Sequence, residues 1–275
     1  MGPWIMFTKH LQGWDLGQIV QGIKSAGLDG ADLCVRPGYP VTPENAPKEL
    51  PAAARRFAEE GLSIPLITTP GDFTDASMPY AQPLFEACAE AGVKLVKLGY
   101  WSMEEGGYWA TVDRVRKRLE GFVALAEKTG VKPIIHNHSG STMGLNSCAA
   151  MNLVKGFDPR LVGIFADVGH LSIVGEPYPM AFDIVKEYLS AVAFKDLVRQ
   201  RFIEGGKPVW RIDVWPLGMG YADFPLIMRL LRDMNFEGPI SFHCEYSNLP
   251  PESVVDQCRI DVRYIRKIVE ELGQG

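Results

Sequence analysis

Several segments with helix-like apolar spacing run into a glycine and then directly into a short apolar run. These glycines are Gly27, Gly61, Gly92, Gly130 and Gly238. A glycine adopts the left-handed conformation that ends a helix without the steric cost of a side chain. In each case the apolar run begins within one or two residues. The pattern therefore predicts repeated joints in which a helix ends and a strand begins.

The apolar runs that follow several of these joints carry few polar residues, as at 62–67, 93–98 and 161–165. Runs of this kind suit a parallel sheet covered by helices better than a sheet with one wet face. Polar residues gather just after the runs: Thr68, Thr69, Tyr100, Trp101, His136, Asn137, His138, Asp167, His170, Lys195, Asp196, His243 and Glu245. Chemistry at the carboxyl ends of successive parallel strands is typical of a barrel enzyme.

The whole chain, residues 1–275, therefore reads as one domain with eight strands and eight helices, a single (β/α)₈ TIM barrel in the α/β class. A doubly wound parallel sheet is the alternative fold, but no glycine-rich phosphate-binding loop follows the first strand. Residues 197–221 form the longest stretch without a helix or strand pattern. We expect this stretch to be an irregular loop that is functional or mobile.

Composition and charge narrow the class of protein. An apolar share of 47% and a charged share of 22% are ordinary for a globular domain. A net charge of −5 offers no basic face for nucleic acid. We find neither a membrane-length apolar run nor a secretory signal at the start. The five cysteines contain no CxxC pair, so we expect mostly buried free thiols and a reducing cytoplasm.

Four of the five histidines sit at expected strand ends: His136, His138, His170 and His243. One such histidine alone would be read as structural, but together with Asp167 and Glu245 they favour a divalent metal site. The two-residue period of a strand places His243 and Glu245 on one face. If Glu245 points into the mouth, His243 lies one layer lower and supports the site rather than binding the metal.

Lys195 ends the seventh expected strand, on the same face as the small Ala193. It could have a lowered pKa, or it could stabilise an enediolate as a cation. It could equally be a structural partner of a carboxylate, and the residues alone leave these alternatives open. Lys9, Arg36 and the aromatic residues Tyr100, Trp101 and Trp215 suit a substrate with many hydroxyl groups, although aromatic residues more often belong to the core.

These motifs resemble the xylose-isomerase-like superfamily, which contains sugar isomerases, ketose 3-epimerases, inosose dehydratase and endonuclease IV. The resemblance covers nearly the whole chain. Its carriers are GLDGADL at 27–33, HNHSG at 136–140, VGIFADVGHL at 162–171, FKD at 194–196, PLGMG at 216–220 and GPI at 238–240, which leads to Glu245. Together they are specific for the superfamily and not for one reaction.

The resemblance implies a divalent metal, often Mn²⁺, held by groups after strands five, six and eight and by a histidine in strand seven. His136 stands where the family has a glutamate, Asp167 and Glu245 match, and Ala193 replaces the histidine. The implied metal ligands are therefore His136, Asp167 and Glu245, with His138 also able to contribute. The two-glutamate proton shuttle of the 3-epimerases is incomplete, and the acidic charge argues against an endonuclease.

We therefore expect an isomerase or epimerase that removes a proton next to the carbonyl of a sugar or keto-sugar. The expected catalytic residues are Lys195, Glu245 and His170, and the expected substrate-binding residues are Lys9, Arg36, Trp101 and His138. A lyase or dehydratase acting by β-elimination on a keto-sugar or keto-glycoside stays open, as does a carbohydrate-binding barrel with reduced catalysis. We expect a small-molecule carbohydrate partner, no nucleic acid or membrane, and a chain able to form a homo-oligomer.

Overall fold

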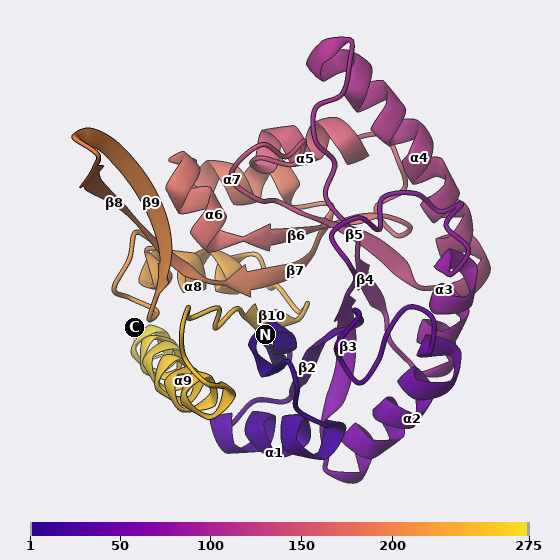
Figure 1. The fold of residues 1–275 in the computed structure, drawn as a ribbon, viewed down its shortest axis with the longest axis horizontal. Coiled ribbons are helices and arrows are strands. Elements are labelled where there is room, and N and C mark those ends of the chain that lie inside the picture. The colour runs from indigo at the N-terminus through magenta and orange to yellow at the C-terminus, as the bar shows by residue number, and fades with distance from the viewer. Residues whose placement is uncertain (1, 274–275) are drawn as a thin grey trace.

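Eight parallel strands close into a barrel in the computed structural model, which describes residues 2–273 (Figure 1). The strand order around the barrel is β1-β10-β7-β6-β5-β4-β3-β2. The expected (β/α)₈ barrel is confirmed. The strands are β1 (Trp4–Phe7), β2 (Gly30–Cys34), β3 (Ser63–Thr68), β4 (Leu95–Lys97), β5 (Lys132–His136), β6 (Gly163–Asp167), β7 (Leu189–Phe194) and β10 (Ile240–Phe242).

Helices surround the barrel and bury their apolar faces against the outside of the strands (Figure 1). They are η1 (Thr8–Leu11), α1 (Leu16–Ala26), α2 (Ala46–Glu59), α3 (Ala81–Glu90), α4 (Gly107–Thr129), α5 (Ser147–Val154), α6 (Val168–Val174), α7 (Tyr178–Val185), α8 (Phe224–Asp233) and α9 (Pro251–Gly273). Within residues 2–273, no helix combines the length and apolarity needed to cross a bilayer. Four cysteines are buried free thiols and Cys148 is exposed, as expected for the majority.

The glycine joints are confirmed at four of the five positions. Gly27, Gly61, Gly92 and Gly130 have positive φ angles between 71° and 76°. The expectation was wrong at Gly238, which does not have a positive φ. Asn235 takes the left-handed conformation after α8, with φ 50°. Gly238 is required for close packing instead, because a Cβ there would lie 2.6 Å from the carbonyl oxygen of Ser190.

Apolar side chains fill the inside of the barrel below its carboxyl-end mouth. This inner cluster is Ile5, Leu66, Leu95, Ile134, Phe165, Ala191 and Ala193. It comes from six strands and is almost completely shielded from solvent. The polar strand ends therefore stand on a packed floor, which holds their side chains in place and keeps bulk water out from below.

Residues 197–221 are not an irregular loop as expected. Most of them form an antiparallel hairpin of β8 (Asp196–Glu204) and β9 (Lys207–Trp215), which projects from the barrel in Figure 1. Gly205 and Gly206 make the two-residue turn, with φ of 56° and 76°. Positive φ at both turn positions matches the twist of a hairpin, which is why a Gly-Gly pair between two strands is a hairpin signal.

Asp196 ties the base of this hairpin to the barrel. Its buried carboxylate accepts hydrogen bonds from the backbone N–H groups of Leu197, Gly218, Gly220 and Ala222, at 2.8–3.0 Å. These bonds fold the chain back from β9 toward α8. A single side chain therefore satisfies backbone donors from both sides of the hairpin.

We expect Asp196→Ala to lower the free energy of unfolding by about 3 kcal/mol or more, because it leaves two buried and two partly buried N–H groups without an acceptor. Urea denaturation measures the change. Asp213→Ala, on β9 of the same hairpin, is the matched control and should change stability by less than about 0.5 kcal/mol. Equal effects of the two variants would contradict the role of Asp196.

Candidate active site

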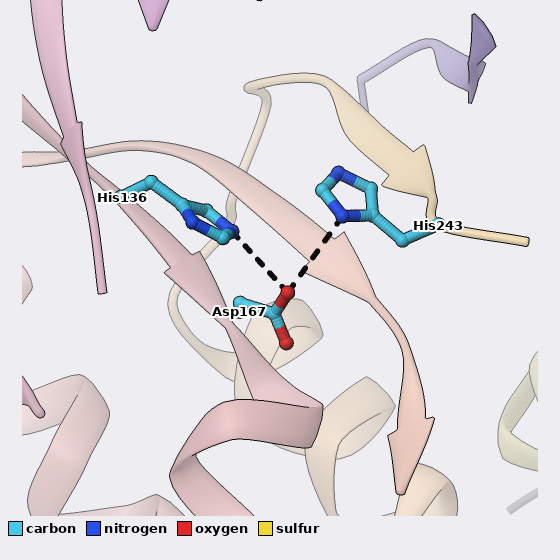
Figure 2. A group of neighbouring side chains, drawn as sticks. All are labelled: His136, Asp167 and His243. Carbon is cyan, nitrogen blue, oxygen red and sulfur yellow. Dashed lines mark hydrogen bonds and ion pairs between the residues drawn. The ribbon is translucent and has the colours of Figure 1, made fainter. Parts of the chain in front are cut away.

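The carboxylate of Asp167, at the end of β6, lies at the centre of the polar cluster. Its Oδ2 atom is 3.2 Å from Nε2 of His136 and 3.7 Å from Nδ1 of His243, as Figure 2 shows. The same oxygen is 3.5 Å from Nζ of Lys195 and 3.8 Å from Nε2 of His170. Side chains from the ends of three other strands and from α6 (Val168–Val174) therefore converge on one oxygen atom.

The local fold explains why this oxygen faces the mouth of the barrel. Asp167 is the N-cap of α6, and its Oδ1 accepts a 3.0 Å hydrogen bond from the backbone N–H of His170. Asn137 holds the backbone of Asp167 on both sides, accepting from its N–H at 2.7 Å and donating to its carbonyl at 3.3 Å. With Oδ1 committed to the helix, Oδ2 is directed toward the other groups. The sequence analysis gave Asn137 no role.

Burial disfavours the charged form of Asp167, but the positive charge of Lys195 and the neighbouring His170 outweigh it and hold the pKa of Asp167 well below its usual value. The side chain is 0% exposed and keeps its negative charge. A buried carboxylate of this kind is stable only with close compensating groups.

Lys195 and Glu245 form a buried ion pair at the mouth, and Lys9 pairs with the other oxygen of the Glu245 carboxylate. Burial opposes the charge on Lys195, yet Glu245 and Asp167 raise the pKa of Lys195 above its usual value. The alternative of a lowered Lys195 pKa is therefore wrong. Burial likewise opposes the charge on Glu245, but Lys195, His243 and Lys9 hold the pKa of Glu245 well below its usual value.

Three of the histidines are held uncharged by their surroundings. Burial lowers the pKa of His136 well below the usual value, and it lowers the pKa of His138 to a smaller extent. Burial also lowers the pKa of His170 to about 3. The rings of His138 and His170 lie 3.8 Å apart between centroids, and Ser139 contacts both. Neutral imidazoles such as these can accept protons or bind metal.

The strand period placed His243 one layer below Glu245, as a supporting residue, but in the structure its ring lies close to Asp167. It stacks on Phe7 with a 4.4 Å centroid separation, and its two ring nitrogens are buried without a hydrogen-bond partner among residues 2–273. Its Nδ1 belongs to a group with His136 and Asp167 in which the donor atoms all lie within 4.8 Å of one another. Two ring nitrogens without partners in a buried polar cluster fit the role of a metal ligand better than that of a support.

The group of His136, Asp167 and His243 therefore fits a divalent ion in donor type and spacing. Tyr100 supports this fit, because its hydroxyl lies 3.0 Å from Nδ1 of His136 and can donate or accept there. Nε2 of His136 can then carry a proton toward Asp167 or give up that proton to bind a metal. Glu245, the expected third ligand, does not belong to this group, because its carboxylate is engaged by Lys9 and Lys195.

A cleft at the mouth connects these residues to solvent. It consists of an inner cavity of about 100 Å³ and an outer one of about 420 Å³, both lined by Lys9, His138, Lys195 and Glu245. Arg36 lines the inner part. Leu197, Ile212 and Val214 of the hairpin line the outer part, so β8 and β9 form one wall of the cleft.

The expected substrate residues do not all meet in this cleft. Lys9, Arg36 and His138 line it, but Trp101 does not. The Trp101 side chain is buried, and its indole N–H donates a 3.0 Å hydrogen bond to the carbonyl of Thr74. This contact directs the ring into the protein core, so Trp101 is a packing residue and does not face the cleft.

Tyr100, which the sequence suggested for the substrate, lines the inner cavity together with Lys97, to which the sequence analysis gave no role. The ammonium group of Lys97 lies 3.6 Å from the centre of the Tyr100 ring and has no hydrogen-bond partner within the part of the chain that the structure describes. Burial and the charge of Arg36 lower the pKa of Lys97 well below its usual value. The signal was a lysine inside the apolar run at 93–98, which is unusual for a buried strand.

Comparisons with known proteins agree with the fold. A family model described as "Xylose isomerase-like TIM barrel" matches residues 20–268. An inosose dehydratase of Lactiplantibacillus plantarum is 29% identical over 89 residues, which cover 32% of this chain and 29% of that relative. The matched stretch is thus under a third of the length of that protein.

Two solved structures illustrate the likeness. The 3-keto-D-glucoside 4-epimerase of E. coli has a TM-score of 0.72 at 15% identity, covering 97% of this chain and all of its own. A xylose isomerase-like TIM barrel protein from Mycobacterium smegmatis in complex with magnesium has a TM-score of 0.70 at 16% identity, covering 98% of this chain and 96% of its own. At these identities the likeness shows the fold.

The low pKa of His170 predicts how stability depends on pH. In the unfolded chain, His170 becomes protonated as pH falls below the usual histidine pKa of 6.5. In the folded chain, His170 stays uncharged until pH falls to about 3. The free energy of unfolding should therefore fall as pH decreases, and His170 should account for about 2 kcal/mol between pH 7 and pH 5. Denaturation of metal-free protein should show a loss smaller by this amount in His170→Gln. An unchanged slope would contradict the uncharged state of His170.

Measurements of divalent-ion binding should distinguish the ligand set His136, Asp167 and His243 from the set expected from the sequence, in which Glu245 takes the place of His243. Asp167→Asn and His243→Ala should each remove most bound Mn²⁺, because each deletes one of three donor atoms. Glu245→Gln should retain it, and Lys195→Met should bind it more tightly, because an ammonium group 3.5 Å from the same Asp167 oxygen is removed. Calorimetric titration with Mn²⁺ measures all four variants. Loss in Glu245→Gln with retention in His243→Ala would restore the set expected from the sequence.

Proposed function

We propose that this chain, which belongs to the xylose isomerase-like TIM-barrel family, is an enzyme. It moves a proton at the carbon next to the carbonyl of a keto-sugar. The outcome is isomerisation or epimerisation of a small-molecule carbohydrate. The observation that carries this proposal is the buried Lys195–Glu245 pair facing the cleft. It supplies a fixed cation and a carboxylate side by side, which are the two groups that enolisation needs.

Lys195 supplies the positive charge in this scheme. Removing a proton next to a carbonyl pushes negative charge onto the carbonyl oxygen, and a preorganised cation lowers the energy of that state more than it stabilises the neutral ketone. The Lys195 ammonium is buried and charged, and it points into the inner cavity. Lys9 and Arg36 line the same cavity, which adds to the positive potential.

Glu245 supplies the group that moves the proton, and His170 lies beside Lys195. Glu245 is ionised and lies against Lys195, so a carbonyl oxygen near Lys195 places the adjacent C–H within reach of the carboxylate. Nε2 of His170 is 3.3 Å from Nζ of Lys195, and Nδ1 of His170 is 2.8 Å from Oγ of Ser139. His170 is uncharged, so the proton that Glu245 takes up is the one returned to the enediolate, and His170 accepts a hydrogen bond that orients the Lys195 ammonium.

His136, Asp167 and His243 would hold the divalent ion, Mn²⁺ or Mg²⁺, and that ion would polarise the substrate carbonyl as a Lewis acid. Lys195 contacts both Asp167 and Glu245 directly, so its positive charge is fixed at the site without the ion. The free thiols at Cys34, Cys88, Cys148, Cys244 and Cys258 suit a reducing cytoplasm, where we place the enzyme.

Elimination of water is the second function that the site supports. It begins with the same proton removal but needs an acid for the departing hydroxyl group. The charged ammonium of Lys195 lines the outer cavity and can donate that proton, with the rings of His138 and His170 beside it. The similarity to an inosose dehydratase supports this alternative for a keto-sugar or keto-glycoside.

An activity screen tests the proposal and separates the two outcomes. Ketoses, 3-keto-glucosides and inososes are incubated with the protein in the presence of Mn²⁺, Mg²⁺ or a chelator, and products are followed by NMR. New isomers or epimers support the first function, and loss of water supports the second. Binding of these sugars without conversion under every condition would favour a carbohydrate-binding barrel instead.

Lys195→Met keeps the side-chain volume and removes the charge. We expect kcat to fall by about 10²-fold with a smaller change in KM, the scale seen when one group that stabilises an oxyanion is removed. Kinetics are measured well below the melting temperature, with circular dichroism to confirm folding. Lys24→Met, which breaks a surface ion pair with Glu60, is the control. A lower melting temperature with an unchanged kcat would make Lys195 a structural partner of the carboxylates.

A further inference from the structure

The hairpin of β8 and β9, called the arm from here on, exposes more apolar surface than the rest of the chain. Within residues 2–273, six of the eleven exposed large apolar side chains lie on the arm or just after it: Phe202, Ile203, Trp210, Ile212, Met219 and Tyr221. Exposed apolar residues scattered singly need no explanation, but a concentration of this kind marks an interaction surface.

The outer part of the arm has no partner among the described residues. Its two strands form a separate two-stranded sheet, and Figure 1 shows them extending beyond the ring of helices. Ile203 is 60% exposed and Trp210 is 54% exposed. The guanidinium groups of Arg199 and Arg211 lie over the rings of Trp210 and Phe202. An isolated hairpin is marginally stable in water, so a covering surface would stabilise the arm.

Charge indicates what kind of surface covers it. Residues 199–215 carry Arg199, Arg201, Lys207 and Arg211 against Glu204 and Asp213, which gives a net charge of +2. The whole chain has a net charge of −5, so the remaining residues together carry −7. A second copy of this chain therefore offers an acidic body to a basic, apolar arm.

The body also offers a concave apolar surface. A groove of about 670 Å³ lies between the loop before α4 and the start of α5, and no charged residue lines it. Met103, which lines the groove, is 66% exposed, and the neighbouring Trp109 is 67% exposed. Glu105, two residues after Met103, is exposed. Among residues 2–273, no hydrogen bond, ion pair or aromatic contact joins this groove to the arm of the same chain.

We propose that the arm of one copy packs into this groove of a second copy, so that the protein is a two-fold dimer with exchanged arms. The apolar side chains near the arm tip, Ile203 and Trp210, fill the groove, while the arginines lie toward the acidic body. Two-fold symmetry uses the contact twice, which doubles the buried area. Because Ile212 and Val214 also line the catalytic cleft, the dimer fixes the wall that these residues form.

Sedimentation velocity over a range of concentrations tests the dimer. The parent should be dimeric, and Ile203→Glu and Trp210→Glu should each raise the dimer dissociation constant by at least about tenfold, as expected for central apolar anchors. Ile260→Glu replaces an equally exposed apolar residue on α9 and should leave the dimer intact. Both arm positions are exposed, and circular dichroism checks that the variants fold. A monomeric parent, or a dimer insensitive to both arm variants, would overturn the proposal.

Cross-linking tests the groove. Cys148 lines it and is the one exposed cysteine among residues 2–273, the other four being buried. A Glu204→Cys variant treated with a short bis-maleimide should give a covalent dimer through Cys148, and the same variant with Cys148→Ser should not. An arm-dependent dimer that gives no cross-link through Cys148 would overturn the assignment of the groove.

Discussion

One buried carboxylate oxygen, Oδ2 of Asp167, organises the mouth of this barrel. The side chain is 0% exposed, and a negative charge in such a place is tolerated only if nearby groups compensate for it. The cap of α6 engages the other oxygen, so compensation must come from the barrel side. Lys195, His136 and His243 meet there because the strand ends around the barrel point to one place.

This arrangement has a consequence for catalysis. The ammonium group of Lys195 and a divalent ion held by His136, Asp167 and His243 would both contact Oδ2 of Asp167. Each positive charge would therefore weaken the attraction of the other to this oxygen. The fixed cation is already present in the chain, in contact with Glu245 and facing the cleft. The proposed proton transfer therefore rests first on the Lys195–Glu245 pair, and a metal adds polarising power to it.

The fold could be predicted because its signals are local: glycine joints, apolar runs and polar strand ends. The convergence of His136, Asp167 and Lys195 follows from those strand ends. The position of the His243 ring could not be predicted, because His243 follows the end of β10 and its ring is held by stacking against Phe7 rather than by strand period alone. Trp101 turned inward because the carbonyl of Thr74, distant in sequence, accepts its N–H. The hairpin was signalled by Gly205-Gly206, but its alternating residues were mistaken for a loop.

The central claim is that a proton is removed next to a carbonyl by groups at the Lys195–Glu245 pair. The most direct test is NMR of a converted keto-sugar in deuterated water, comparing the parent with Glu245→Gln. The account predicts deuterium at the carbon next to the carbonyl with the parent, and incorporation slower by about 10²-fold or more with Glu245→Gln. Repeated conversion without any deuterium at that carbon, or equal incorporation by both proteins, would contradict it.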